Sequence, residues 1–260
     1  MSEQTTAIGL LERPEVQNTF IKVIQSANRG MSEQEAQLRV QQEVINFQEH
    51  CIYNNELANC DPQSVLFGIR KVIGANLSLD RAKGHTYLTP EGIKQADGSY
   101  KKVLKVEYQA EGMLVLHYNA GTIIDHKRPQ IEYNEKGKVV SVKWEYKLSN
   151  GRWESAQLLE MHFEKLRKAS HVKNGRNKND ADLNKMNYAN PNYTSFSGGI
   201  DPEFASAKCI KHALKKMALD RNKFQPQPTP VVTPTEAEHE VIDVDTIEVD
   251  NDNQPIDFTT

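Results

Sequence analysis

The sequence predicts an α+β protein in which helices pack on a small antiparallel sheet with a protruding β-hairpin. Helix-type periodicity in the first third and strand-like segments between turn dipeptides in the middle support this class. The charge distribution adds a boundary. Residues 224–260 contain no Lys or Arg and nine acidic residues, so residues 1–223 carry +6 when the whole chain carries −3. We expect one folded domain over residues 1–223, then a flexible Pro-rich linker and a disordered acidic tail over residues 224–260.

Three helices are predicted in the first third of the chain. Residues 14–27 repeat apolar side chains at helical spacing. A second helix begins after Ser32, because Glu35 lies three residues later and completes a capping box. A third begins with Asp61 as the N-cap and Pro62 in the first helical position.

Strands dominate the middle of the chain. Residues 85–89 and 100–108 are predicted strands that flank a turn segment, residues 90–99, in which Asp97-Gly98 is a strong hairpin signal. The elements expected next are a helix over 112–119, strands near 123 and 131, strands over 139–146 and 153–158, and a helix over 159–170.

The C-terminal part begins with a long polar segment. Residues 171–200 are rich in Asn, Gly, Lys and Tyr, which predicts a long loop. Asp201-Pro202 begins the last helix, expected to reach about Leu219. A Pro/Thr-rich linker follows.

A basic stretch between residues 165 and 223 indicates a polyanion partner. It holds thirteen Lys or Arg residues against five acidic residues, and Tyr188, Tyr193 and Phe196 are interleaved with them. Cations neutralise phosphates, and aromatic rings stack on bases regardless of sequence. A solvated helix face followed by a loop is the alternative interpretation. The candidate DNA-binding residues of this stretch are Lys165, Arg167, Lys168, Lys208, Lys211 and Lys215.

The predicted hairpin holds a second set of candidates. Its DNA-binding candidates are Tyr87, Lys101, Lys102 and Lys105. Because alternate residues of a strand share a face, Lys101 and Lys105 are expected on the face opposite to Lys102. Such a ribbon would track a DNA strand. An edge hairpin that uses lysines to block strand pairing is the alternative.

Several function classes find no support in the sequence. It contains no phosphate-binding loop, no dinucleotide-binding glycine motif, no nucleophile elbow and no HExxH pair, so we expect no catalytic residues, metal or cofactor. No apolar run approaches the roughly 20 residues of a membrane helix. The N-terminal residues lack the order of a signal peptide, and three cysteines without metal-ligand spacing suit a reducing compartment, so we expect a cytoplasmic protein.

Three segments resemble the RecT family of phage recombination proteins in order and spacing. The first is Asn59-Cys60-Asp61-Pro62 with its helix, followed by the strand that begins Gly84-His85-Thr86-Tyr87 and ends at Pro90. The second is Gly112-Met113-Leu114 up to Gly121, and the third is the helix from Phe204-Ala205 to Ile210-Lys211. The likeness covers about residues 55–220. Ala110, Glu111 and the Ser206-Ala207-Lys208 triplet depart from the family pattern.

The resemblance implies an ATP-independent protein that binds single-stranded DNA and anneals complementary strands in phage-type homologous recombination. It implies a homo-oligomer, either a ring or a helical filament, that holds single-stranded DNA and then the annealed duplex DNA. It also implies a partner exonuclease, the single-strand-binding protein of the host, and a place in the bacterial host cytoplasm. Two other classes remain open: a passive, sequence-tolerant nucleic-acid-binding protein, and a phage metal-dependent nuclease.

Overall fold

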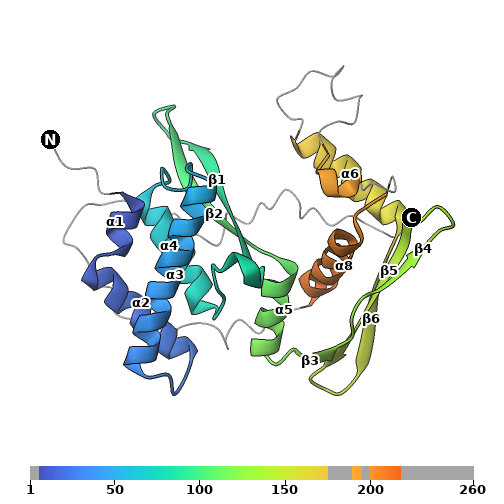
Figure 1. The fold of residues 1–260 in the computed structure, drawn as a ribbon, viewed down its shortest axis with the longest axis horizontal. Helices are drawn as coiled ribbons and strands as arrows, with labels where there is room; N and C mark the ends of the chain where they lie inside the picture. Colours follow the sequence, from blue (N-terminus) through green and yellow to red (C-terminus); the bar gives the residue numbers. More distant parts are fainter. Residues whose placement is uncertain (1–5, 175–188, 195–198, 218–260) are drawn as a thin grey trace. The chain divides into compact units, whose positions relative to one another are not determined.

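The structure is a computed structural model that describes residues 6–174, 189–194 and 199–217 (Figure 1). Within these residues it contains seven α-helices and two antiparallel sheets, which confirms the α+β prediction. The predicted linker and acidic tail lie outside the described residues, as does most of the predicted loop over residues 171–200.

The chain forms two compact units. The described part of the first comprises residues 6–129, 144–156 and 206–217, and that of the second comprises residues 130–143, 157–174, 189–194 and 199–205. The predicted boundary at residues 223 and 224 falls beyond the described residues and stays a prediction.

Four helices form the core of the first unit: α1 (Ala7–Leu11), α2 (Pro14–Ala27), α3 (Glu33–Tyr53) and α4 (Pro62–Gly74). Their buried side chains form one cluster that includes Phe20, Phe47 and Ile69. Local signals set the helix ends as predicted. Ser32 and Glu35 form the complete capping box, and the Asp61 carboxylate accepts a hydrogen bond from Ser64 N at 2.9 Å.

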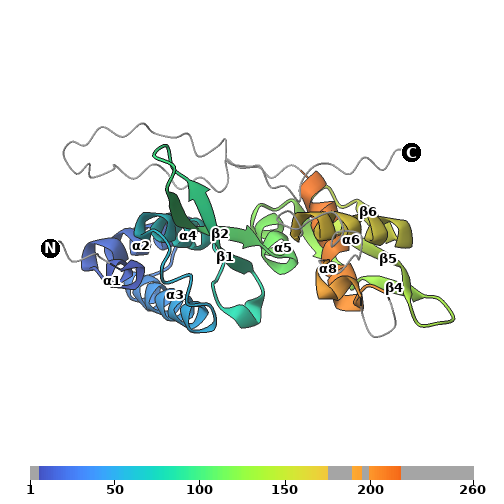
Figure 2. The same cartoon turned by 90° about the horizontal axis from the view of Figure 1, so that it is seen from above.

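The hairpin consists of β1 (Thr86–Lys94) and β2 (Tyr100–Tyr108), paired from Thr86↔Tyr108 to Lys94↔Tyr100. One face packs on α4, where a Cβ at Gly68 would lie 2.9 Å from Leu104 Cδ2. Both views show the hairpin projecting beyond α4 (Figures 1 and 2). The hydrophobic contact with α4 therefore anchors the strands and leaves the turn at their far end exposed.

A buried carboxylate fixes the segment between α4 and the hairpin. Glu43 of α3 accepts hydrogen bonds from Ser78 Oγ and Leu79 N, each at 2.7 Å, and from Asn46 Nδ2 at 3.2 Å. Arg39 of the same helix donates to the carbonyl oxygen of Leu77 at 3.1 Å. These bonds hold the chain just before the 3-10 helix η1 (Arg81–Lys83).

The rest of the first unit includes α5 (Ala110–Asn119) and β3 (Ile123–His126). β3 pairs with the end of β5 (Val139–Leu148), through Ile123↔Leu148 and His126↔Tyr146. β6 (Trp153–Leu159) also pairs with β5. Trp144 of β5 is fully buried, with its ring 4.8 Å from that of Tyr146.

The second unit includes the beginning of β5, residues 139–143. There β4 (Gln130–Tyr133) pairs with β5 through Gln130↔Lys143 and Ile131↔Val142. α6 (Glu160–Asn174) follows β6, and Lys138 Nζ forms an ion pair with Glu160 at 2.6 Å. The short helix η2 (Pro191–Tyr193) precedes α8 (Pro202–Lys216), whose residues from Ser206 onward belong to the first unit.

Three predicted boundaries and one omission are corrected. β1 continues through Pro90 to Lys94, so the turn is shorter than the predicted turn segment, residues 90–99. Within the described part of the chain, β1 pairs with one strand only, and an edge strand of this kind tolerates a proline. α6 continues to Asn174, into the predicted loop, and α8 ends at Lys216. The prediction also missed α1, which has only five residues.

Candidate nucleic-acid interface

The hairpin presents its candidate residues on two faces, as predicted. Leu104 and Val106 face Gly68 of α4, so Lys102 belongs to the packed face and Lys101 and Lys105 to the opposite face. Tyr87 pairs with Glu107 and therefore shares the face of Lys105.

The three candidate lysines of the hairpin, Lys101, Lys102 and Lys105, lie beside carboxylates. Lys101 Nζ is 2.9 Å from Asp61, Lys102 Nζ is 3.2 Å from Glu56, and Lys105 Nζ is 3.3 Å from Glu107 and 3.9 Å from Glu91. The hairpin is therefore a mixed-charge ribbon. Exposed ion pairs of this kind stabilise a protein by about 0–1 kcal/mol. A DNA phosphate would have to compete with each carboxylate, at a small cost in stability.

The second candidate group lies on α6, in the second unit. Lys165, Arg167 and Lys168 follow one another within one turn, and Lys168 is exposed while the other two are half-buried. The Arg167 guanidinium donates to the Glu164 carboxylate at 2.8 Å.

The third group lies on α8, whose apolar and basic residues lie on different faces. Cys209, Ile210, Ala213 and Leu214 are all buried. Lys208, Lys211 and Lys215 follow the spacing of another face; Lys215 is exposed and the other two are half-buried. Both views place α8 beside α5 (Figures 1 and 2). Packing on one side therefore directs the lysine stripe away from the core.

Two segments of the RecT resemblance are direct neighbours in the first unit. Gln109 N donates to His85 O at 3.0 Å, and Gln109 Nε2 donates to Thr86 O at 3.1 Å. A Cβ at Gly112 would overlap the carbonyl oxygen of His85 and lie 2.9 Å from its carbonyl carbon. The close approach of α5 to the start of β1 therefore requires glycine at position 112.

The sequence interpretation missed a cavity of about 350 Å³ beside Tyr87. Tyr53 at the end of α3 and Arg81 of η1 line it together with Tyr87, and the Arg81 guanidinium lies 3.8 Å from the centre of the Tyr53 ring. No spacing in the sequence signals this group, because Tyr53, Arg81 and Tyr87 come from three separate elements.

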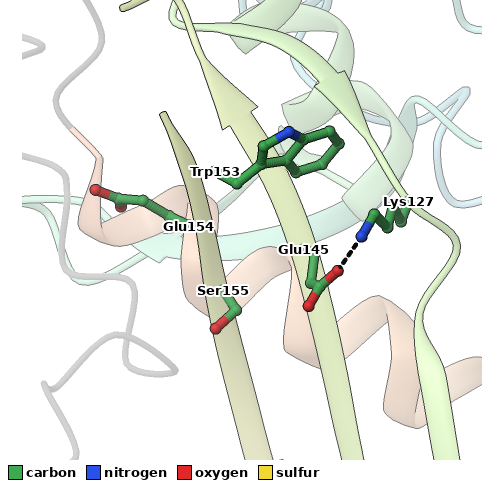
Figure 3. Close-up of a pocket in the computed structure, with 5 residues that line it drawn as sticks. All are labelled: Lys127, Glu145, Trp153, Glu154 and Ser155. Carbon is green, nitrogen blue, oxygen red and sulfur yellow. Dashed lines mark hydrogen bonds and ion pairs between the residues drawn. The ribbon is translucent and has the colours of Figure 1, made fainter. Parts of the chain in front are cut away.

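A second cavity, of about 220 Å³, lies on the β3–β5–β6 sheet (Figure 3). The ammonium of Lys127 lies 2.6 Å from the Glu145 carboxylate and 5.0 Å from the centre of the Trp153 ring. Glu154 and Ser155 complete the lining. The sequence interpretation did not single out these residues either. Lys127 already has an anionic and an aromatic neighbour, which suits a structural role on the sheet.

Metal-ligand clusters and reactive thiols are two common sources of catalytic chemistry. Nowhere in the described ranges do three or more His, Cys, Asp or Glu side chains gather where they would hold a metal ion. The three cysteines are free and buried. Burial raises the pKa of the Cys51 thiol to about 11 and also raises the pKa of Cys60. At neutral pH both are therefore poor nucleophiles.

Comparison of the sequence with known proteins found no match among protein-family models and none among curated proteins. Across the described part of the chain, no helix combines the length and the apolar character needed to cross a membrane.

Proposed function

We propose that this protein binds single-stranded DNA without a nucleotide cofactor and anneals complementary strands, as a member of the RecT family. The observation that carries the proposal is the division of α8 into a buried apolar face and a stripe formed by Lys208, Lys211 and Lys215. Spaced by three and four residues, these cations suit successive phosphates of a DNA backbone. The hairpin lysines and the α6 group, Lys165, Arg167 and Lys168, supply further cations.

Annealing, beyond binding, is proposed from the RecT resemblance and from the chemistry of the candidates. Cations that contact phosphates leave base edges available to a second strand. Base pairing itself then supplies the driving force, so no hydrolysis is required. On the basis of the same resemblance, we propose that the chain assembles into a ring or helical filament and acts with a partner exonuclease and the host single-strand-binding protein. The proposed location is the bacterial cytoplasm.

The test is an annealing assay with the full chain and two complementary labelled oligonucleotides, without ATP. We expect annealing faster than the protein-free rate, and single-strand binding that weakens by roughly 0.7 log units per phosphate contact for each tenfold rise in salt. No acceleration at a concentration that saturates the DNA would reduce the protein to a passive binder. Shortening of the DNA on adding divalent metal would indicate a nuclease. Electron micrographs with and without complementary strands would show a ring or a filament.

The role of α8 is tested by Lys211→Ala and Lys215→Ala. Each should weaken single-strand binding and lower the salt slope by about 0.7 if it removes one phosphate contact. The free energy of unfolding should stay within about 0.5 kcal/mol of the wild type. Lys136→Ala removes the same charge from an exposed turn of the second unit and is the matched control. Lost stability with unchanged binding per folded molecule would show that the α8 lysines are structural.

A further inference from the structure

The cavity beside Tyr87 combines an apolar floor with two accessible aromatic rings. Leu57 and Leu88 are 1% and 5% exposed and form its floor, whereas Tyr53 and Tyr87 are 74% and 56% exposed. Tyrosine rings usually bury much of their apolar surface. Two highly exposed rings at one cavity therefore leave stacking surface available to a flat ligand.

A cation lies at the same opening. The guanidinium carbon of Arg81 lies over the Tyr53 ring, 3.8 Å from its centre, so a cation with several N–H donors lies beside this ring. Asp80 N-caps η1, in which Arg81 is the first residue, and so orders the backbone that carries the arginine. A planar ring combined with an anionic group matches these side chains best.

The polar groups of the cavity hold its walls in place. His50 Nε2 lies 2.8 Å from Leu79 O, and Gln109 Nε2 donates to Thr86 O at 3.1 Å. The first contact ties α3 to the segment before η1, and the second ties the start of α5 to β1. All lining residues belong to the first unit, so the cavity is a feature of one body.

We propose that this cavity binds one unpaired nucleobase of a single DNA strand, with the base stacked against Tyr53 and Tyr87 and its phosphate near Arg81. The inference rests on the proposed function, because it assigns a base-binding subsite to the same single-strand interface. The volume of about 350 Å³ lies within the range of roughly 300–1,000 Å³ that is usual for small-ligand sites. A stacked base is recognised by its π-face, so the subsite tolerates any sequence.

The subsite distinguishes single strands from duplex. A base in the cavity is unavailable for pairing and must leave it when the complementary strand arrives. The cavity therefore contributes to single-strand affinity and contributes nothing to duplex affinity. Tyr87, expected at the DNA interface from its place on the hairpin, thus acts on the base, whereas the lysines act on phosphates.

The test compares binding of the full chain to an oligothymidylate and to an abasic oligonucleotide of the same length and phosphate count, by fluorescence anisotropy. The wild type should prefer the oligothymidylate roughly tenfold, as one aromatic–base stack predicts. Tyr87→Ala and Tyr53→Ala should each remove most of this preference and leave duplex affinity unchanged. Tyr87→Phe keeps the ring and should retain the preference. Tyr133→Ala, an exposed tyrosine of β4, is the control and should behave as the wild type.

The outcomes separate this inference from the proposed function. If the wild type binds neither oligonucleotide, the proposed function itself fails. Equal binding to both, or an unchanged preference in Tyr87→Ala and Tyr53→Ala, overturns the subsite and leaves phosphate-driven DNA binding intact. Equal losses in oligothymidylate and abasic binding, with an unchanged circular dichroism spectrum, would show that the tyrosines support the phosphate contacts, and would also overturn it.

Discussion

Gly112→Ala tests the close approach between α5 and the start of β1. The added Cβ would overlap His85 O and would lie 2.9 Å from the carbonyl carbon and 3.0 Å from Cα of His85. All three atoms are backbone, so no side chain can rotate to relieve the overlap. Two hydrogen bonds also hold His85 in place. Gln109 N donates to the His85 carbonyl oxygen, and Ser78 N donates to the His85 ring at 3.2 Å.

The size of the effect follows from these contacts. Forcing extra volume into a packed region costs about 1–3 kcal/mol. Losing the hydrogen bond from Gln109 N adds about 1 kcal/mol. Alanine is the better helix former and offsets about 1 kcal/mol. We therefore expect Gly112→Ala to lower the free energy of unfolding by about 2 kcal/mol.

The assay is urea unfolding of the full chain, followed by circular dichroism, with two comparison variants. A Cβ at Gly92 would lie 3.8 Å from Tyr100, an ordinary contact, so Gly92→Ala should leave stability unchanged or raise it by up to about 1 kcal/mol. Gly68→Ala meets only the side chains of Leu104 and Val106, which can shift, so its effect should be intermediate. If Gly112→Ala is as stable as Gly92→Ala, the described approach of α5 to β1 is wrong.

Four further predictions concern stability and DNA affinity. Glu43→Ala leaves three buried donors without an acceptor and should cost about 3 kcal/mol in urea unfolding, whereas a loss below about 1 kcal/mol would contradict the buried network. Burial lowers the pKa of His117, so below about pH 6.5 the unfolded chain binds a proton more readily than the folded chain. The free energy of unfolding of the wild type should therefore decrease as the pH is lowered below about 6.5, and it should decrease less steeply in His117→Gln. Asp61→Asn keeps an N-cap acceptor but removes the carboxylate that pairs with Lys101. Affinity for single-stranded DNA at low salt should therefore rise about two- to fivefold, with little change in the thermal midpoint of unfolding. Unchanged affinity would show that Lys101 lies outside the interface. Truncation after Phe224 removes nine acidic residues and should raise DNA affinity at low salt, with the gain fading as salt rises; loss of folding would show that the tail belongs to the folded domain.

Local chemistry explains the parts of the fold that were predicted correctly. The capping box of Ser32 and Glu35, the Asp61 cap and the Asp97-Gly98 turn each operate within four residues, so their signals are contained in short stretches of sequence. The predicted end of β1 at residue 89 was wrong because Pro90 was treated as a strand breaker. A proline has no N–H to donate, so it interrupts a strand only where a neighbouring strand would accept that hydrogen bond.

The features of the candidate interface likewise fall into those that local sequence determines and those that depend on tertiary packing. The sequence alone determined the α+β class, the helical caps and the placement of Lys101 and Lys105 on the strand face opposite to Lys102, because these follow from periodicity and from contacts between near neighbours. Tertiary structure alone decided that Asp61 and Glu56 lie beside Lys101 and Lys102, that α5 approaches β1 at Gly112, and that Tyr53, Arg81 and Tyr87 line one cavity. These groups come from different elements, and their proximity depends on how helices and strands pack, which no local pattern encodes.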